Sequence, residues 1–281
     1  MTKAKKELLF IIFGLVIGAI EVLLILALLL FNMGNSPQPA APATTAATTE
    51  AATEPTESPV PLNGFKPEDF VKVNGFMTCT AAEYMIGIDV SSHQGKIDWA
   101  QVKAAGVQFV IIRLGYRGYG DEGNLVKDPM AQEYYEGAKS QGLLVGGYVF
   151  SQALNEEEAI EEANMVLEVT QDWELDLPVA FDWEFLHFEA RTDDMYDGAI
   201  TDCAIAFCRT LEESGVQPML YTGLYVKTLR LEEVLGYPMW LALYSDNMSY
   251  PYWMNFWQYS CTGRVPGIET DVDLNIYLPQ S

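Results

Sequence analysis

Apolar runs of strand length alternate with helix-like segments from residue 86 onward, and this alternation constrains the fold more than any other feature. Alternating pairs are predicted first, with strands at 86–90, 108–114, 143–150, 177–185 and 217–222 and helices at 98–104, 128–142, 156–169, 195–214 and 224–235. Three more strands, at 239–244, 255–260 and 271–276, are separated by gaps too short for crossover helices. Repeated β–α units imply a parallel sheet with helices outside, and about eight strands imply closure. The prediction is an α/β fold, a modified TIM-type barrel of about five β–α units followed by about three strands.

The predicted strand at 177–185 ends in two carboxylates, Asp182 and Glu184, with Trp183 between them. Alternate residues of a strand share a face, so the two acids project side by side with Cα atoms about 6.5 Å apart. The negative charge of one acid raises the pKa of the other. Glycoside hydrolysis requires such a pair, with one acid protonated and one ionised. For this stretch alone, a solvated strand end with two exposed acids is an equal alternative.

Other predicted strands carry polar or aromatic residues at or near their ends: Asp89, Arg113, Tyr148, Tyr221, Tyr244, Trp257, Gln258 and Asp273. Functional side chains collect at the C-terminal strand ends of such barrels. Aromatic rings suit sugar faces, and acids and amides suit hydroxyls, so the set indicates a glycan site. Alternatives remain open. The acids can form a polar cap, the tyrosines and Trp257 can be core, and Arg113 can simply neutralise the acid cluster.

The first 61 residues predict attachment to a membrane. Lys3, Lys5 and Lys6 precede an apolar run at 8–33, about 39 Å long as a helix, which can span a bilayer. Residues 1–33 are therefore predicted to form a short cytoplasmic segment and a single transmembrane helix, with the rest of the chain outside the cell. A cleaved signal peptide is the lesser alternative. Residues 34–61 are rich in Ala, Thr and Pro and predict a disordered linker.

The remaining chain divides into a short preface at 62–85, with two Asn-Gly turn signals, and the barrel at 86–281. A net charge of −23 excludes the basic patch that nucleic acid requires, whereas a neutral glycan is compatible. His93 and His187 are the only histidines, and no metal-ligand spacing is present, so neither a metal nor a cofactor is expected. Of the four cysteines, Cys79 and Cys261 can pair outside the cell.

Several motifs occur in a fixed order: Gly87-Ile88-Asp89-Val90-Ser91-Ser92-His93-Gln94-Gly95, Ile97-Asp98-Trp99, Phe109-Val110-Ile111-Ile112-Arg113, Gly147-Tyr148-Val149-Phe150-Ser151, Phe181-Asp182-Trp183-Glu184, Met219-Leu220-Tyr221-Thr222, Trp257-Gln258-Tyr259 and Val272-Asp273-Leu274-Asn275. From residue 86 to the C-terminus the chain resembles glycoside hydrolase family 25, the Chalaropsis-type lysozymes. The resemblance implies a barrel with irregular final strands. It also implies cleavage of the β-1,4 bond after N-acetylmuramic acid in peptidoglycan. Its catalytic carboxylates match Asp89, Asp182, Glu184 and Asp273, whereas Val149 departs from members that carry His there.

Our hypothesis is that Glu184 protonates the leaving oxygen, because its side chain is longer and nearby acids raise its pKa. Asp182 is then the ionised partner. Three roles remain open for it: it attacks the sugar, it activates water, or it stabilises an oxazolinium formed by the substrate's own N-acetyl group. Two other functions stay open: an inactive wall-binding module and a hydrolase of another N-acetylated glycan such as chitin. The expected partners are peptidoglycan strands and a lipid bilayer, with a monomeric catalytic domain outside the cell membrane.

Overall fold

The computed structural model describes residues 60–186, 189–223 and 229–279. The apolar run at 8–33 and the linker up to residue 59 lie outside these residues. Among the residues that the structure describes, no helix is long and apolar enough to cross a membrane.

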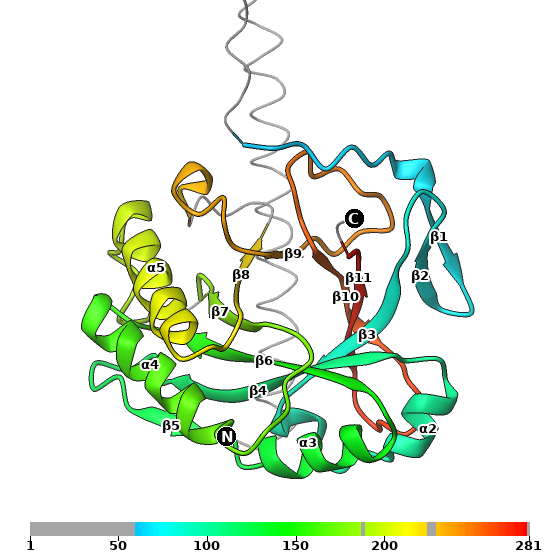
Figure 1. The fold of residues 1–281 in the computed structure, drawn as a ribbon, viewed down its shortest axis with the longest axis horizontal. Helices are drawn as coiled ribbons and strands as arrows, with labels where there is room; N and C mark the ends of the chain where they lie inside the picture. The colour runs from blue at the N-terminus through cyan, green and yellow to red at the C-terminus, as the bar shows by residue number, and fades with distance from the viewer. Residues whose placement is uncertain (1–59, 187–188, 224–228, 280–281) are drawn as a thin grey trace, which may run out of the picture. The chain divides into compact units, whose positions relative to one another are not determined.

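Eight strands close into a barrel (Figure 1). In chain order they are β3 (Met85–Val90), β4 (Phe109–Arg117), β6 (Leu144–Ser151), β7 (Val179–Trp183), β8 (Pro218–Gly223), β9 (Met239–Ala242), β10 (Phe256–Gly263) and β11 (Val272–Tyr277). The first seven are parallel neighbours. The last, β11, runs antiparallel to both β10 and β3 and closes the ring. A short strand, β5 (Leu125–Lys127), adds to the edge of β4. The predicted closed α/β barrel is confirmed.

The described part of the chain has four helices outside the barrel: α2 (Trp99–Ala104), α3 (Ala131–Ser140), α4 (Glu156–Val169) and α5 (Asp197–Glu213), with α4 and α5 packed side by side (Figure 1). Helix α4 begins where the sequence predicts, because Asn155 accepts a hydrogen bond from the backbone of Glu158 at 3.0 Å. Helix α3 begins later than predicted, because Asp128 bonds to the backbone of Met130 and also binds Arg113.

The fifth predicted helix, at 224–235, is wrong over the part that the structure describes. Residues 224–228 lie outside the description, and residues 229–235 contain only the 3-10 turn η3 (Leu231–Glu233). The backbone N–H of Arg230 bonds to the Thr201 hydroxyl of α5 at 3.0 Å, and its side chain pairs with Glu233. This segment is therefore tied to α5 as a turn, and four β–α units with helices are described.

Strand alternation divides the apolar side chains into two clusters. One fills the barrel interior and includes Phe109, Ile111, Met219, Trp240 and Phe256. The other packs between the barrel and its helices. Gly87 leaves room for the interior cluster, because a Cβ there would lie 2.2 Å from Cζ of Phe109.

The segment before the barrel contains a hairpin formed by a 3-10 turn, η1 (Pro67–Asp69), and strands β1 (Phe70–Val73) and β2 (Phe76–Cys79). Asn74 and Gly75 form its two-residue turn with φ of 52° and 88°, as the Asn-Gly signal predicts. Phe70 packs edge-on against Trp257, with ring centroids 5.1 Å apart. The hairpin thus covers the outer wall of the barrel.

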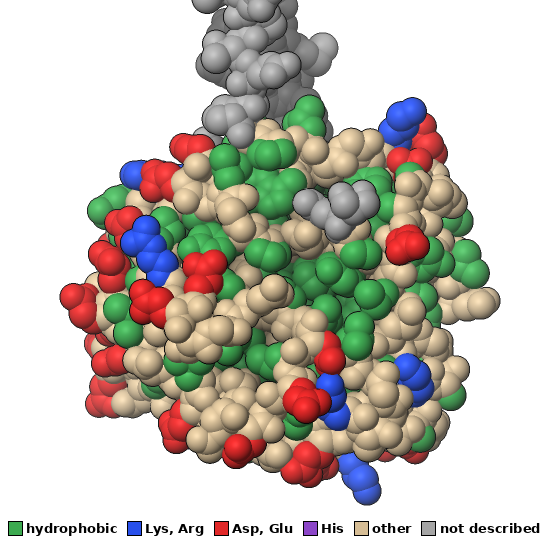
Figure 2. All heavy atoms as spheres, in the orientation of Figure 1, with side chains coloured by type: hydrophobic (Ala, Val, Ile, Leu, Met, Phe, Trp, Pro, Cys, Tyr) green, Lys and Arg blue, Asp and Glu red, His purple; other side chains and the backbone are tan. Residues whose placement is uncertain are grey.

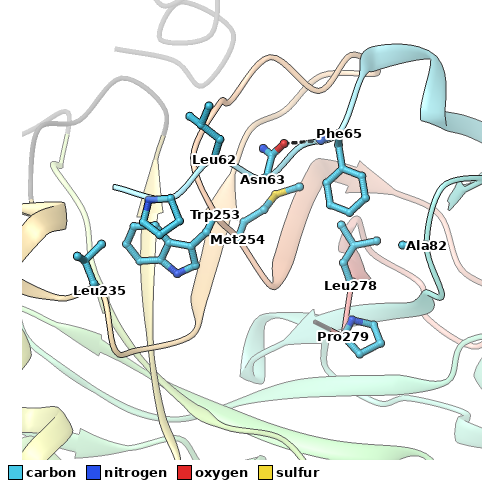
Figure 3. Close-up of a pocket in the computed structure, with 10 residues that line it drawn as sticks. Leu62, Asn63, Phe65, Ala82, Leu235, Trp253, Met254, Leu278 and Pro279 are labelled. Atoms are coloured by element: carbon cyan, nitrogen blue, oxygen red, sulfur yellow. Dashed lines mark hydrogen bonds between the residues drawn. The ribbon is translucent and has the colours of Figure 1, made fainter. Parts of the chain in front are cut away.

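The described chain enters the barrel at the end where the parallel strands begin. The carbonyl of Pro61 accepts a hydrogen bond from Trp253 at 2.9 Å, and the backbone of Asn63 donates to Pro251. With Leu235 and Leu278 these segments surround a cavity of about 420 Å³ (Figure 3). Its lining residues precede β3, β9 and β10 or follow β11, so it lies opposite the C-terminal ends of the parallel strands.

Candidate active site

Four acids meet at the mouth formed by the C-terminal strand ends. Asp89 is the fifth residue of β3, Asp182 lies in β7, and Glu184 directly follows that strand. Asp273 is the second residue of β11 and the register partner of Asp89. Because β11 is antiparallel, its beginning lies at the same end of the barrel as the ends of its parallel neighbours.

Two side-chain amides hold Asp89. Gln258 Nε2 and Asn275 Nδ2 donate to the same carboxylate oxygen, Oδ2, at 2.8 and 2.7 Å. These bonds favour the ionised carboxylate, but burial opposes them and raises the pKa of Asp89 to about 6.

Aromatic donors in turn orient the two amides. Tyr221 and Tyr244 donate their hydroxyls to Oε1 of Gln258 at 2.9 and 3.1 Å. The indole of Trp240 donates to Oδ1 of Asn275 at 2.8 Å. Each amide oxygen is therefore occupied, and each amide nitrogen must face Asp89.

Asp182 and Glu184 are neighbouring acids, and each shifts the pKa of the other. Asp182 is only 4% exposed, and burial, followed by the charges of Glu184 and Asp89, raises its pKa well above the usual value. Glu184 is less buried, and burial raises its pKa as well. Burial thus opposes the ionised form of Asp182 that our hypothesis assigns to it.

Asp273 is the fourth acid, and burial together with the charge of Asp89 raises its pKa to about 8. Both shifts favour the protonated forms of Asp273 and Asp89 and so reduce the negative charge of the mouth. The mouth holds four carboxyl groups but fewer than four negative charges.

The three predicted tyrosines lie with the acids. Tyr148 and Tyr221 pack edge-on against Trp240 inside the barrel, with ring centroids 6.0 and 4.8 Å away. Burial raises the pKa of both phenols well above the usual value, followed by the charges of Asp89 for Tyr148 and Glu184 for Tyr221. The ring of Tyr244 is 55% exposed at the rim and is available to a ligand.

Trp257 was expected in the site, but the structure does not bring it to the mouth. Its indole is fully buried on the outer side of β10, where Nε1 donates to the carbonyl of Leu243 at 2.8 Å. The next residue, Gln258, faces inward because successive strand residues alternate. A sugar-stacking role for Trp257 is therefore wrong.

Arg113 lies near the acids but pairs elsewhere. Its Nε and Nη2 both lie 2.8 Å from Asp128 Oδ2, and Nη2 donates to Ser92 Oγ at 3.1 Å. Its charge favours ionised Asp182 only from a distance. Arg113 thus acts on the acid cluster through its charge, while its direct ion pair is with Asp128.

Sequence reasoning did not assign roles to Asn275 and Trp240, which complete the network around Asp89. Asn275 follows Asp273 by two residues and Trp240 precedes Tyr244 by four, so strand alternation places each on the inner side of its own strand.

Among the described residues, no group of three or more His, Cys, Asp or Glu side chains can hold a metal ion. His93 is exposed in the 3-10 turn η2 (Ser92–Gln94), and His187 lies outside the described residues. All four cysteines are free thiols, so the disulfide considered between Cys79 and Cys261 is not formed.

Comparison with known proteins agrees with this geometry. The family model for glycosyl hydrolases family 25 matches residues 88–268, more than half of the chain. Lysozyme M1 of Streptomyces globisporus is 28% identical over 211 residues, which cover 67% of this chain and 66% of that protein. The autolytic lysozyme of Clostridium acetobutylicum is 30% identical over 196 residues, 68% of this chain but only 55% of that protein.

A solved structure shows the same architecture. The bacterial lysozyme from Streptomyces coelicolor aligns with a TM-score of 0.55 at 26% identity, over 70% of this chain and 93% of that one. The family predicted from the ordered motifs is confirmed. The chain belongs to the glycosyl hydrolases of family 25 and is a glycosidase.

Proposed function

We propose that this glycosidase is a lysozyme that cleaves the β-1,4 bond between N-acetylmuramic acid and N-acetylglucosamine in peptidoglycan. The observation that carries the proposal is the pair of neighbouring acids, Asp182 and Glu184, at a mouth that also holds Asp89 and Asp273. The names of two relatives, both lysozymes, support this substrate.

Glu184 is the member of the pair that delivers the proton. It directly follows β7 and is less buried than Asp182, so it is the carboxyl that a glycan at the mouth can reach. Its proton passes to the glycosidic oxygen as the bond to the leaving sugar breaks. The negative charge left on the pair then stabilises the positive charge that develops on the other sugar.

Replacing Glu184 with Gln removes this proton donor while keeping the shape of the side chain. We expect the release of reducing ends from purified peptidoglycan to fall by about 10² to 10⁴. Glu189→Gln, an exposed acid outside the cluster, is the matched control and should keep full activity. Thermal unfolding at the wild-type temperature checks the fold, and substantial turnover by the folded Glu184→Gln protein contradicts the assignment.

The chemical identity of the new reducing ends tests the substrate. Muramic acid at the new ends supports cleavage at the proposed bond, whereas glucosamine indicates the other linkage. Turnover of chitin with intact peptidoglycan left uncut would replace the proposal with hydrolysis of another N-acetylated glycan.

We also propose that residues 1–33 anchor the protein in the cell membrane with the barrel outside. The support is sequence alone: Lys3, Lys5 and Lys6 before the apolar run at 8–33. In intact cells, external protease should release the barrel into the medium, and full-length protein should sediment with membranes. Full-length protein found free in the medium or in the cytosol argues against the anchor.

A further inference from the structure

The loop that joins β4 to β5, residues 118–124, forms one side of the mouth and is called the rim loop below. Tyr119 of this loop and Phe150 of β6 both line a cavity of about 500 Å³. The cavity adjoins the acids, because Phe150 is the register partner of Asp182. The position of the rim loop therefore bounds the opening on this side of the acids.

Two arginines hold the backbone of the rim loop. The backbone N–H of Arg191 donates to the carbonyl of Tyr119 at 3.0 Å, and Nη1 of Arg117 donates to the carbonyl of Gly123 at 3.0 Å. Residues 119–122 are exposed, so their side chains contribute little packing. The loop therefore takes its position from hydrogen bonds made to its backbone.

Glu158, in the first turn of α4, fixes the side chain of Arg191. Nη1 and Nη2 of Arg191 lie 2.9 and 2.8 Å from the two carboxylate oxygens of Glu158. A two-point pair of this kind fixes direction as well as distance. The same carboxylate accepts from the backbone N–H of Leu154 at 2.9 Å, so Glu158 is itself held at the start of the helix. Helix α4 thus anchors Arg191.

Gly123 of the rim loop leaves the space that this pair occupies. A Cβ on Gly123 would lie only 1.9 Å from Nη1 of Arg191. Its φ of 53° also lies in the left-handed region, which favours glycine. The rim loop and the guanidinium are therefore in close contact, and a displaced Arg191 would no longer support the loop.

Stability alone does not account for Arg191. Its side chain is only 7% exposed, and its Nε is a buried donor without a hydrogen-bond partner among the described residues. A buried donor without a partner lowers the free energy of unfolding. Residues that lower stability in this way are expected at functional sites, and Arg191 lies against a loop of the mouth.

We propose that Arg191 is a positioning residue for the glycan site: paired with Glu158, it holds the rim loop where the substrate chain requires it. Arg191 acts through the backbone of Tyr119 and touches no reacting atom. A displaced loop changes the opening beside the acids and leaves the acids themselves in place, so substrate binding is lost before bond cleavage. This inference rests on the proposed function, since the substrate chain is the glycan that the acids cut.

The test compares KM with kcat in the full-length protein on soluble glycan strands of peptidoglycan. In Arg191→Met, KM should rise about fivefold to tenfold while kcat falls less than about twofold. Glu158→Gln, which keeps the shape of the side chain, should raise KM in the same direction. The double variant should be no worse than Arg191→Met alone, because both changes remove one contact.

Lys139→Met is the matched control. It removes a partly buried ion pair with Asp176, which directly precedes the strand β7 at the end of the barrel away from the acids. We expect this change to leave both KM and kcat as in the wild type. Thermal unfolding of every variant separates a loss of stability from a change in KM.

An unchanged KM in folded Arg191→Met would overturn this inference alone, provided that the wild type cuts the strands. A fall in kcat at constant KM would also overturn it, because it would indicate an effect on the acids. If Arg191→Met does not fold, Arg191→Lys replaces it, since lysine keeps the charge but not the two-point pair. Glycan strands left uncut by the wild type would overturn the proposed function, and this inference with it.

Discussion

Asp89 illustrates how single residues set the charge of this site. Its carboxylate accepts from Gln258 and Asn275, and three aromatic donors fix the direction of those amides. Burial raises the pKa of Asp89 and the two amide hydrogen bonds lower it, and the resulting pKa is about 6. A small change in the amides should therefore move this acid across the neutral range.

Asn275→Ala should shift the acidic limb of the pH–activity profile to higher pH. Removing a donor to the ionised form raises the pKa of Asp89 further, so a higher pH is needed to ionise it. The profile of kcat/KM against pH measures the shift. Asn124→Ala, at an exposed position, should leave the profile in place. A uniform loss of activity with an unmoved limb would indicate a purely structural role for Asn275.

Strand alternation accounts for what could be predicted at the level of residues. Alternation correctly predicts that Asp182 and Glu184 lie together. Applied to Trp257 and Gln258, it also predicts that one of these neighbours faces inward and the other outward. It could not reveal how strongly burial raises the pKa of each acid of the pair. That depends on burial by the whole barrel, because Asp182 is the more enclosed of the two.

Among the elements, β11 shows the limit of a strand prediction. The sequence located this strand but did not give its direction. The structure pairs it antiparallel to β3 and β10, so its first residues carry the acid that other strands carry at their ends. Direction follows from the short connection after β10, which allows a hairpin return but no crossover helix.

The predicted helix at 224–235 failed for a related reason. Its residues have ordinary helix propensity, but Arg230 bonds to Thr201 of α5 and the turn η3 ends at Glu233. A tertiary contact overrides the local preference, and no local pattern contains that contact.

Helix α4 is tied to β4 by a buried ion pair, Arg117 with Glu162, whose side chains are 4% and 0% exposed. Arg117→Met should cost about 3–5 kcal/mol of unfolding free energy, because it leaves Glu162 buried without a cation. The double variant Arg117→Met/Glu162→Met should recover most of this loss. Urea unfolding measures both.

Lys127→Met is the control for that experiment. Its ion pair with Glu168 is exposed on both sides, so the change should cost less than about 1 kcal/mol. Equal losses for Arg117→Met and Lys127→Met would show that the buried pair does not hold α4 to the barrel.

The whole molecule carries a net charge of −23, and the face in Figure 2 shows acidic side chains along its edges with apolar ones across its centre. Some acids are buried, and burial raises the pKa values of Asp89, Glu162 and Asp273 to about 6, 7 and 8. These groups bind protons more tightly in the folded protein than in the unfolded chain.

Stability should therefore fall as pH rises from about 4 to 8. The contribution of each raised group is fully present below its unfolded pKa and is lost as pH passes through its folded pKa. The midpoint of thermal unfolding, measured across this range, tests the trend. Asp273→Asn, which keeps a neutral group in place, should flatten it. A midpoint that rises through the same range would contradict the burial argument.

The chain reaches the barrel through Pro61 and Asn63, on the side away from the four acids. A partner or surface that binds the chain at Pro61 and Asn63 therefore leaves the mouth with its four acids uncovered.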